Sequence, residues 1–462
     1  MIHYQFDTSM SPTASEDPVS AWHTGGPGGS SMYGLYGELG YFQVSSSGLL
    51  NNDDYSFNKV SNMLYLESPA GSFLTPTEAG MSSGFSYCLI DGVRQELCNW
   101  NDTSQAAAYA ATLSTFYEAF PEYGDNDLLF IGESYAGQYI PNIANYILTS
   151  PNVDPELAQR LKGIAVGNGC WGGGSDSFMC NGPNEDRDNV ELFHGKGLIS
   201  SKLYKKIQST CTFSETEVAF DSSSPAPTSP ECSALLDVME DQVGPFNIYN
   251  VYDNCPQDDD AAASFKSWRE KSGKGARWVR RYLLSNIHRP IHEVRQELSD
   301  MGGGYDWTCG QFDAIPDWFA QSEVRDALNL PAESMTSQFN YDLSGPASVT
   351  LYPALLQSGL RVLIYNGDAD ACVPYIGNEI WTTGMEDHGV VEEVDAWHTW
   401  FIDKTDATAT GASTSYKVIG GDSETGEMFQ FVTVRLAGHE VPGFAPRAGF
   451  SIFDKFVKGE VF

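Results

Sequence analysis

The strongest candidate for chemistry in this sequence is a serine between a predicted strand and a predicted helix. Ser134 lies in the segment GESYAG at 132–137, which follows the apolar run at 128–131 and precedes apolar residues at helical spacing: Ile140, Ile143, Ala144 and Ile147. Small neighbours let a serine take strained backbone angles in such a turn, and the helix N-terminus offers N–H groups to an oxyanion. This context predicts a nucleophile at Ser134; the alternative is an ordinary serine in a strand-to-helix turn.

A second segment, GMSSG at 80–84, matches the pattern G-x-S-x-G more literally around Ser82. About one such match is expected by chance in a chain with this glycine, serine and alanine content. No apolar strand leads into the segment, because TPTE at 75–78 intervenes, and no helical pattern follows. We therefore do not expect Ser82 to be a nucleophile.

A serine nucleophile needs a general base and an acid that orients it, in the chain order Ser, Asp, His. Asp368 and Asp370 come directly after an apolar run at 361–365, and His439 directly after a predicted strand at 431–436. The other late histidines fit less well, since His388 ends an acidic helix pattern and His398 stands among tryptophans in a strand pattern. A metal site at Asp-Ala-Asp is disfavoured because no third ligand is spaced nearby.

The glycine-rich segment GGPGGSS at 25–31 also follows a predicted strand. A phosphate-binding loop would carry a lysine, which this segment lacks. Read together with the serine turn, the loop can bring a second backbone N–H to an oxyanion.

Alternating strands and helices must position these segments. Strands are predicted at 19–22, 62–66, 128–131, 163–166, 361–365 and 429–436, and helices at 106–120, from 376 and around 450–456. This alternation predicts an α/β fold with a mostly parallel sheet covered on both faces. The stretch 171–345 differs, with a Pro/Ser-rich run at 222–230, so we expect a core of 1–170 and 346–462 with a cap inserted at 171–345.

The composition indicates a globular protein and argues against a nucleic-acid-binding or membrane-spanning one. A hydrophobic content of 41% is enough for a large packed core, and a net charge of −35 argues against binding nucleic acid. No apolar run is long enough to span a membrane. Residues 1–7 lack the basic region and apolar core of a signal peptide, so a secreted form would have lost its signal or the sequence is incomplete here.

Nine cysteines without tight CxxC clusters favour disulfides and an oxidising compartment. Short polar stretches separate three pairs: Cys88 and Cys98, Cys170 and Cys180, Cys211 and Cys232. The sequon Asn101-Asp102-Thr103 predicts glycosylation at Asn101 in the same compartment.

With these segments in this order, the chain resembles the serine carboxypeptidase family, which includes cathepsin A and plant and fungal vacuolar enzymes. The family's segments are recognisable as WHTGGPGGSS (22–31), GLYGELG (34–40), ESPAG with GFSY (67–71, 84–87), GESYAGQYIP (132–141), NGDADACVP (366–374) and GHEVP (438–442). The resemblance implies an α/β-hydrolase fold with Ser134 as nucleophile, Asp370 as acid and His439 as base. It further implies an oxyanion hole from the amides of Gly26 and Tyr135, and a substrate-carboxylate site from Glu38 and Glu133, helped by Thr24 and Gly25.

Carboxylic acids can bind a carboxylate only if at least one of them is protonated and donates a hydrogen bond. Two buried carboxyl groups close together share protons, because both cannot ionise cheaply. The alternative is that Glu38 faces solvent and that Glu133 is only part of the turn.

The chain departs from the family pattern at several positions. Thr24 replaces a usual asparagine, and Gly29 replaces a usual disulfide cysteine whose partner position is Cys309, so we expect Cys309 to pair with Cys255. These four pairs leave Cys372, two residues from Asp370, as the expected unpaired cysteine. Residues 72–83 interrupt a segment that is normally continuous.

The resemblance implies a peptidase that releases C-terminal amino acids from peptides with a free carboxylate through an acyl-enzyme, favoured at acidic pH. It implies no cofactor or metal, leaves a homodimer open, and points to the secretory pathway, with a vacuolar, lysosomal or extracellular destination. One alternative is acyl transfer from glucose esters, as in plant members of the family, several of which carry threonine where this chain has Thr24. Those relatives typically replace the glutamate that precedes the nucleophile, whereas Glu133 is present here. A further alternative is a non-catalytic stabiliser of lysosomal or vacuolar proteins.

Overall fold

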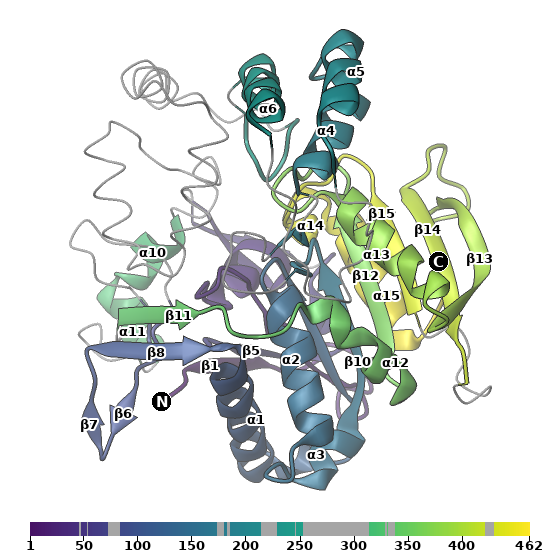
Figure 1. Cartoon of the computed structure of the whole chain (residues 1–462). Coiled ribbons are helices and arrows are strands. Elements are labelled where there is room, and N and C mark those ends of the chain that lie inside the picture. The colour runs from purple at the N-terminus through teal and green to yellow at the C-terminus, as the bar shows by residue number, and fades with distance from the viewer. Residues whose placement is uncertain are drawn as a thin grey trace.

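The structure is a computed structural model, and a nine-stranded sheet forms its centre (Figure 1). It describes residues 1–45, 48–52, 54–72, 84–172, 180–182, 185–213, 229–244, 246–252, 314–328, 330, 338–420 and 429–462. In spatial order the strands are β1 (Tyr4–Asp7), β5 (Asn62–Leu66), β2 (Val19–His23), β9 (Leu128–Glu133), β10 (Leu161–Gly167), β12 (Arg361–Gly367), β15 (Phe429–Val434), β14 (Gly411–Val418) and β13 (Val391–Trp400).

The sheet is mostly parallel, as predicted. Every pair from β5 across to β15 is parallel, whereas β1 at one edge and β14 and β13 at the other run antiparallel to their neighbours. Because the central strands are parallel, their carboxyl ends meet at one edge of the sheet, where such folds place ligands.

Alternate side chains of the central strands enter two different hydrophobic cores. In β9, Leu128 and Phe130 pack into one core, and Leu129 and Ile131 into the other. This is why these strands read as continuous apolar runs, since both faces of the sheet are buried. The three-dimensional arrangement thus confirms the predicted strands at 19–22, 62–66, 128–131, 163–166 and 361–365.

Helices cover both faces of the sheet. The first core contains side chains of α1, α2, α12 and α13, and the second contains side chains of the π-helix η1 and of α15. The helices of these layers are α1 (Asp102–Ala119), α2 (Ala136–Thr149), α3 (Pro155–Arg160), α12 (Tyr352–Gln357), α13 (Tyr375–Asp387), α14 (Val441–Phe444), α15 (Pro446–Lys458) and η1 (Gly34–Leu39).

Several predicted boundaries are wrong by a few residues, and two of them have a clear local cause. Helix α1 begins at Asp102 rather than 106, because Asn101 and Ser104 form a reciprocal capping box at its N-terminus. Strand β15 ends at Val434 rather than 436, because Leu436 has a φ of 62° and turns the chain out of the sheet.

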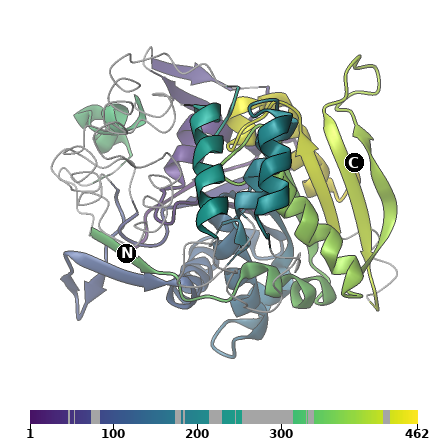
Figure 2. The same ribbon diagram turned by 45° about the horizontal axis from the view of Figure 1, so that its top comes forward.

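Further helices lie over the carboxyl edge of the sheet. Helices α4 (Glu185–Gly195), α5 (Ser201–Thr210) and α6 (Pro230–Val243) share a separate core and stand above that edge (Figure 2). A segment after α6 reaches down to the sheet, where Val251 N–H donates to Ala369 O (2.9 Å) and Ala371 N–H donates to Ile248 O (2.9 Å).

The remaining elements are short. Helices α10 (Ala314–Phe319) and α11 (Ser322–Ala327) lie beside the second core. Two-stranded sheets join β8 (Leu97–Asn101) with β11 (Gln338–Asp342), β3 (Phe42–Ser45) with β4 (Gly48–Asn51), and β6 (Leu89–Ile90) with β7 (Val93–Arg94). Short 3₁₀ turns occupy Phe57–Lys59, Pro121–Tyr123 and Ser348–Thr350.

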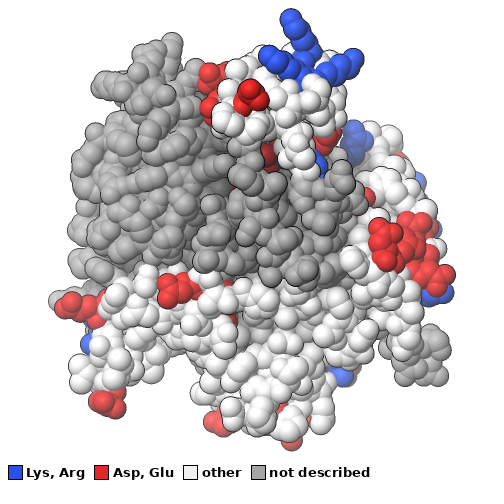
Figure 3. Space-filling view, viewed as in Figure 1, with Lys and Arg blue, Asp and Glu red and all other residues white. Residues whose placement is uncertain are grey.

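Charge is unevenly spread over the described surface. Lysines gather on α5, with Lys202, Lys205 and Lys206 exposed, whereas Glu392, Glu393 and Asp395 form an acidic group on the edge strand β13 (Figure 3). Charged side chains on an edge strand oppose pairing with another sheet. Within the described ranges, no helix has the length and apolar character needed to cross a membrane.

Candidate active site

Ser134 occupies a sharp turn between β9 and α2. Its φ is 61°, a left-handed value that is strained for a residue with a side chain. Ser134 N–H donates to Gly167 O (3.0 Å), and Ser134 O accepts from the N–H groups of Gly137 (2.9 Å) and Cys170 (2.9 Å). These bonds to the end of β10 and to α2 hold the serine in the predicted strand–turn–helix geometry.

Two glycines beside Ser134 have no room for a side chain. A Cβ on Gly132 would lie 2.4 Å from His23 O, and a Cβ on Gly137 would lie 2.3 Å from Cys170 O. Glycine at both positions is therefore required by the close approach of neighbouring backbone atoms, a different reason from the backbone strain for which small residues were predicted.

Asp370 and His439 are in direct contact at the same edge of the sheet. Nδ1 of His439 lies 2.7 Å from Oδ2 of Asp370, and both side chains are buried. Asp370 also accepts from the backbone N–H groups of Cys372 (2.8 Å) and Val373 (3.1 Å). The carboxylate is thus fixed by its own turn after β12 and presents one oxygen to the histidine.

Nε2 of His439 is buried and has no hydrogen-bond partner among the described residues. The backbone N–H of His439 donates to Tyr249 O (2.7 Å), and the two rings lie 4.7 Å apart. Burial is the largest influence on the pKa of His439 and would lower it, but the Asp370 carboxylate, together with Glu440 and Glu38, outweighs burial and raises that pKa above its ordinary value of 6.5. Two strands, β10 and β12, lie between the strand that precedes the serine turn, β9, and the strand that precedes the histidine loop, β15.

Asn168 contacts the Asp370–His439 pair and was missed by sequence reasoning. It is fully buried directly after β10, at a φ of 40°, and its Nδ2 donates to Oδ2 of Asp370 (2.9 Å). Its Oδ1 accepts from Gly367 N–H (2.8 Å), which fixes the amide orientation. The only signal in the sequence was a polar Asn-Gly pair at the end of a buried strand.

The glycine-rich loop packs against the serine turn. A Cβ on Gly25 would lie 2.4 Å from Tyr135 N and 2.6 Å from Ser134 Cβ, so only glycine permits this approach. Gly26 has a φ of 118°. Neither the N–H of Gly26 nor that of Tyr135 has a hydrogen-bond partner among the described residues. Two adjacent free N–H donors beside a serine suit an oxyanion.

Glu38 and Glu133 form a buried carboxyl pair beside Ser134. Glu38, on η1, is 1% exposed, and Glu133, at the end of β9, is 4% exposed. Burial first, and then Glu440, raise the pKa of Glu38 to about 8, although a hydrogen bond from Glu133 lowers it in part. Burial and the Glu38 charge raise the pKa of Glu133 well above its usual value. Glu133 is therefore the protonated donor of the pair, and Glu38 does not face solvent.

Thr24 follows β2 directly. Trp22 Nε1 donates to Thr24 Oγ1 (3.0 Å), which leaves the hydroxyl proton of Thr24 available to another acceptor.

Among the described residues, no three His, Cys, Asp or Glu side chains are arranged to hold a metal ion.

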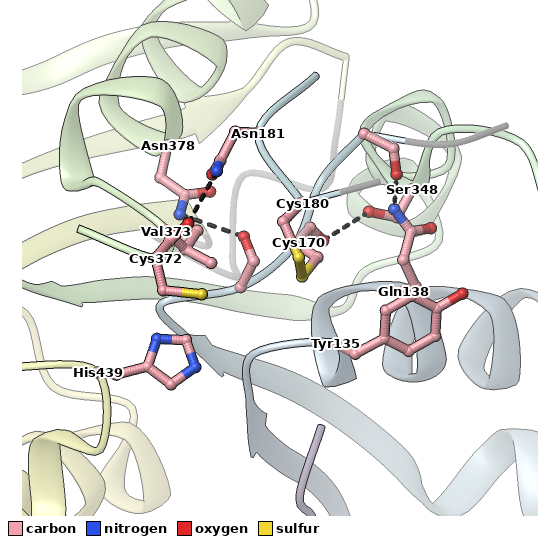
Figure 4. Close-up of a disulfide and its surroundings, with 12 residues drawn as sticks. Tyr135, Gln138, Cys170, Cys180, Asn181, Ser348, Cys372, Val373, Asn378 and His439 are labelled. Carbon is pink, nitrogen blue, oxygen red and sulfur yellow. Dashed lines mark hydrogen bonds between the residues drawn. A yellow bond between two sulfur atoms is a disulfide. The ribbon is translucent and has the colours of Figure 1, made fainter. Parts of the chain in front are cut away.

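Three predicted disulfides are confirmed: Cys88–Cys98, Cys170–Cys180 and Cys211–Cys232. Cys170–Cys180 lies beside the start of α2, and Cys372 carries a thiol that points toward His439 (Figure 4). Asn101 is the N-cap of α1, and its glycosylation stays a prediction. Ser82, Cys255, Cys309 and residues 73–83 lie outside the described residues.

Sheet order, serine turn and Asp–His pair together define an α/β-hydrolase. A crystal structure of the Kex1 prohormone-processing carboxypeptidase from Saccharomyces cerevisiae shares this fold, with a TM-score of 0.60 and 19% identity over 99% of this chain and 86% of that one.

Sequence comparison gives the family. The family model described as serine carboxypeptidase matches residues 1–459. Similar proteins include serine carboxypeptidase-like 21 of Arabidopsis thaliana, 28% identical over 97% of this chain and 86% of its own length. The lysosomal protective protein of Mus musculus is 27% identical over 99% of this chain and 88% of its own length. The chain belongs to the serine carboxypeptidase family and is an enzyme of that class.

Proposed function

We propose that this enzyme removes C-terminal residues from peptides through an acyl-enzyme on Ser134. The observation that carries the proposal is the buried Glu38–Glu133 pair, of which Glu133 immediately precedes the nucleophile. A protonated carboxyl group at this position can donate to the free carboxylate of a peptide and leave its last amide bond over Ser134. An endopeptidase has no use for such a group.

The reaction follows from the roles that we assign to each residue. Ser134 Oγ attacks the carbonyl carbon of the last peptide bond while His439 Nε2 accepts the hydroxyl proton, and Asp370 stabilises the resulting imidazolium. The carbonyl oxygen becomes an oxyanion between the N–H groups of Gly26 and Tyr135. The C–N bond then breaks, and His439 returns the proton to the departing amine. Water attacks the remaining ester by the same sequence and frees Ser134.

The carboxylate site sets the direction of substrate binding. Glu133 donates to one oxygen of the terminal carboxylate, and the Thr24 hydroxyl and Gly25 N–H are further donors. Because ionised Glu38 would repel that carboxylate, binding weakens as pH rises through about 8, the pKa of Glu38. This direction agrees with a preference for acid over alkaline conditions, and with a role in the secretory pathway or an acidic lumen, to which the disulfides also point.

Ser134→Ala tests the assignment. The variant should lose several orders of magnitude in turnover of a free-acid peptide and all labelling by a fluorophosphonate. Ser82→Ala is the matched control and should keep both. Equal losses in the two variants would contradict the choice of nucleophile, and an unlabelled wild-type protein would favour a non-catalytic stabiliser.

Acyl transfer is the second candidate, favoured by Thr24 in place of asparagine. Incubation of the enzyme with a glucose ester and an acceptor alcohol, compared with a free-acid peptide library read out by its C-termini, separates the two. A transferase would esterify the acceptor and leave the peptides intact.

A further inference from the structure

We propose that Asp102 is a positioning residue for the oxyanion hole, which it reaches through the side chain of Tyr135. The inference rests on the proposed function, because it assigns the Tyr135 N–H to the oxyanion. Asp102 is the first residue of α1 and is 3% exposed. The Tyr135 ring extends away from His439 (Figure 4), and its hydroxyl donates to the Asp102 carboxylate.

Four donors surround this carboxylate. Oδ1 accepts from the hydroxyls of Tyr135 (2.8 Å) and Tyr341 (2.9 Å), and Oδ2 accepts from the N–H groups of Ser344 (3.0 Å) and Gly345 (2.7 Å). No cation among the described residues pairs with it. Only an ionised carboxylate accepts on both oxygens, since an amide would turn N–H groups toward two of the donors. The position therefore requires a buried anion, which the N-terminus of α1 also favours.

Tyr135 transmits this anchor to the active site. Its backbone is helical, with φ −60° and ψ −12°, directly after Ser134 at φ 61°. The peptide plane between these two residues carries the Tyr135 N–H, so the direction of that donor depends on both. A strained residue keeps its conformation only where its surroundings over-determine it. The bond from the Tyr135 hydroxyl to Asp102 fixes one end of this plane.

The same cluster also reaches the glycine-rich loop. The rings of Tyr135, Tyr139 and Tyr341 meet edge to face, with centroids 4.9–5.9 Å apart. The Tyr139 hydroxyl accepts from Gly28 N–H (3.1 Å), two residues beyond Gly26. Both halves of the oxyanion hole are thus attached to one buried aromatic unit, whose charged anchor is Asp102.

The test compares Tyr135→Phe with Tyr341→Phe, because each removes one hydroxyl from the same oxygen of Asp102 and leaves the ring. Tyr135→Phe should lower kcat about 10-fold with KM unchanged, less than the loss of a whole oxyanion donor. Tyr341→Phe should lower Tm as much as Tyr135→Phe does. It should change kcat less than about twofold, which is far smaller than the effect of losing an oxyanion donor. Asp102→Asn should lower kcat at least as much as Tyr135→Phe.

A peptide aldehyde provides the readout that a purely structural role would not move. Its hemiacetal with Ser134 occupies the oxyanion hole, whereas the released amino acid does not. Tyr135→Phe should weaken the aldehyde about 10-fold and leave product inhibition unchanged, as expected for a transition-state analogue. The kcat and the aldehyde affinity of each tyrosine variant are compared with those of the wild-type enzyme. Equal changes in Tyr135→Phe and Tyr341→Phe would overturn the inference. Absent wild-type turnover would instead overturn the proposed function and, with it, this inference.

Discussion

Asn168 and His439 bind the same oxygen of Asp370. The Asn168 amide lies 2.9 Å and the His439 Nδ1 lies 2.7 Å from Oδ2, and all three side chains are buried. The amide thus aims the carboxylate at the histidine from the neighbouring strand, β10.

Asn168→Ala should therefore lower kcat about 10-fold while KM changes little, a smaller effect than the roughly 10⁴-fold loss on replacing a triad aspartate. Without the amide, Asp370 keeps its two backbone donors but loses the side-chain donor that orients Oδ2. Steady-state kinetics on a free-acid peptide checks this. Asn168→Asp is the sharper variant, because a second buried carboxylate would repel Asp370 and reduce turnover further. Unchanged kcat in both variants would show that the backbone donors suffice.

Local patterns predicted the sheet, which is confirmed, and selected Ser134, whose role as nucleophile stays a prediction. Ser134 was found because an apolar strand and a helical stripe flank it within about 15 residues, which is the range over which periodicity operates. Asp370 and His439 were found through chain order and strand ends, and then through resemblance. Their contact, between residues 69 apart, is confirmed.

Long-range polar contacts account for what the sequence did not reveal. Asn168 reaches Asp370 across 202 residues, and Tyr341 reaches Asp102 across 239. Asp102 was noted only as the middle residue of a sequon, and nothing in its neighbourhood indicates four donors. Strand β14 was missed, and β13 was noticed only as a strand pattern around His398, because exposed and buried positions do not alternate regularly along them.

A bulky mercurial at Cys372 should inactivate the enzyme. The Cys372 N–H donates to Oδ1 of Asp370 (2.8 Å), and its carbonyl accepts from Asn181 (2.8 Å), so the residue is held beside the triad acid. A mercury adduct on this side chain would displace Asp370 and hence misalign His439. Kinetics after titration with p-chloromercuribenzoate measures the effect.

Cys372→Ser is the control, because it keeps the backbone donor and lacks the thiol. This variant should retain most of its turnover and resist the mercurial. Inactivation of the serine variant at the wild-type rate would mean that another group reacts, and a disulfide at Cys372 in the unreduced protein would also contradict the prediction.

The Glu38 carboxyl should make stability fall with pH. Its pKa is about 8 in the folded protein and near 4.5 in the unfolded chain. A carboxyl group whose pKa is raised by folding stabilises the folded state fully at pH values below its pKa in the unfolded chain. This contribution is lost as pH rises through its pKa in the folded protein. Between these values the folded state holds one more proton, so the free energy of unfolding should drop by about 1.4 kcal/mol per pH unit.

Glu38→Gln should remove this part of the slope, because glutamine does not titrate. Urea unfolding of both proteins from pH 5 to 8 gives the difference, in which the contributions of titrating groups away from the Glu38–Glu133 pair largely cancel. Parallel slopes for the two proteins would mean that Glu38 ionises in the fold as it does in the unfolded chain.

The same carboxyl pair should make the affinity for free-acid peptides depend on pH. Above about pH 8, Glu38 is ionised and repels the terminal carboxylate, so KM should rise with pH for a free-acid peptide. The corresponding amide and ester carry no charge there, and their KM should change little. For all three substrates kcat should fall as pH drops below the raised pKa of His439, because protonated His439 cannot accept the Ser134 proton.

Glu133→Gln separates the two effects. An amide donates without holding a titratable proton, so the variant should keep affinity for the free-acid peptide at neutral pH. The alkaline rise in KM should remain in this variant, because it comes from ionised Glu38. The acid limb of kcat should stay in place, because the bond of His439 to Asp370 is untouched. Measurement of kcat and KM for the three substrates from pH 4 to 9 in wild type and variant tests this. If the free-acid and blocked substrates give parallel KM profiles in the wild-type enzyme, the glutamate pair does not bind the carboxylate, and the selectivity for C-termini must come from other residues.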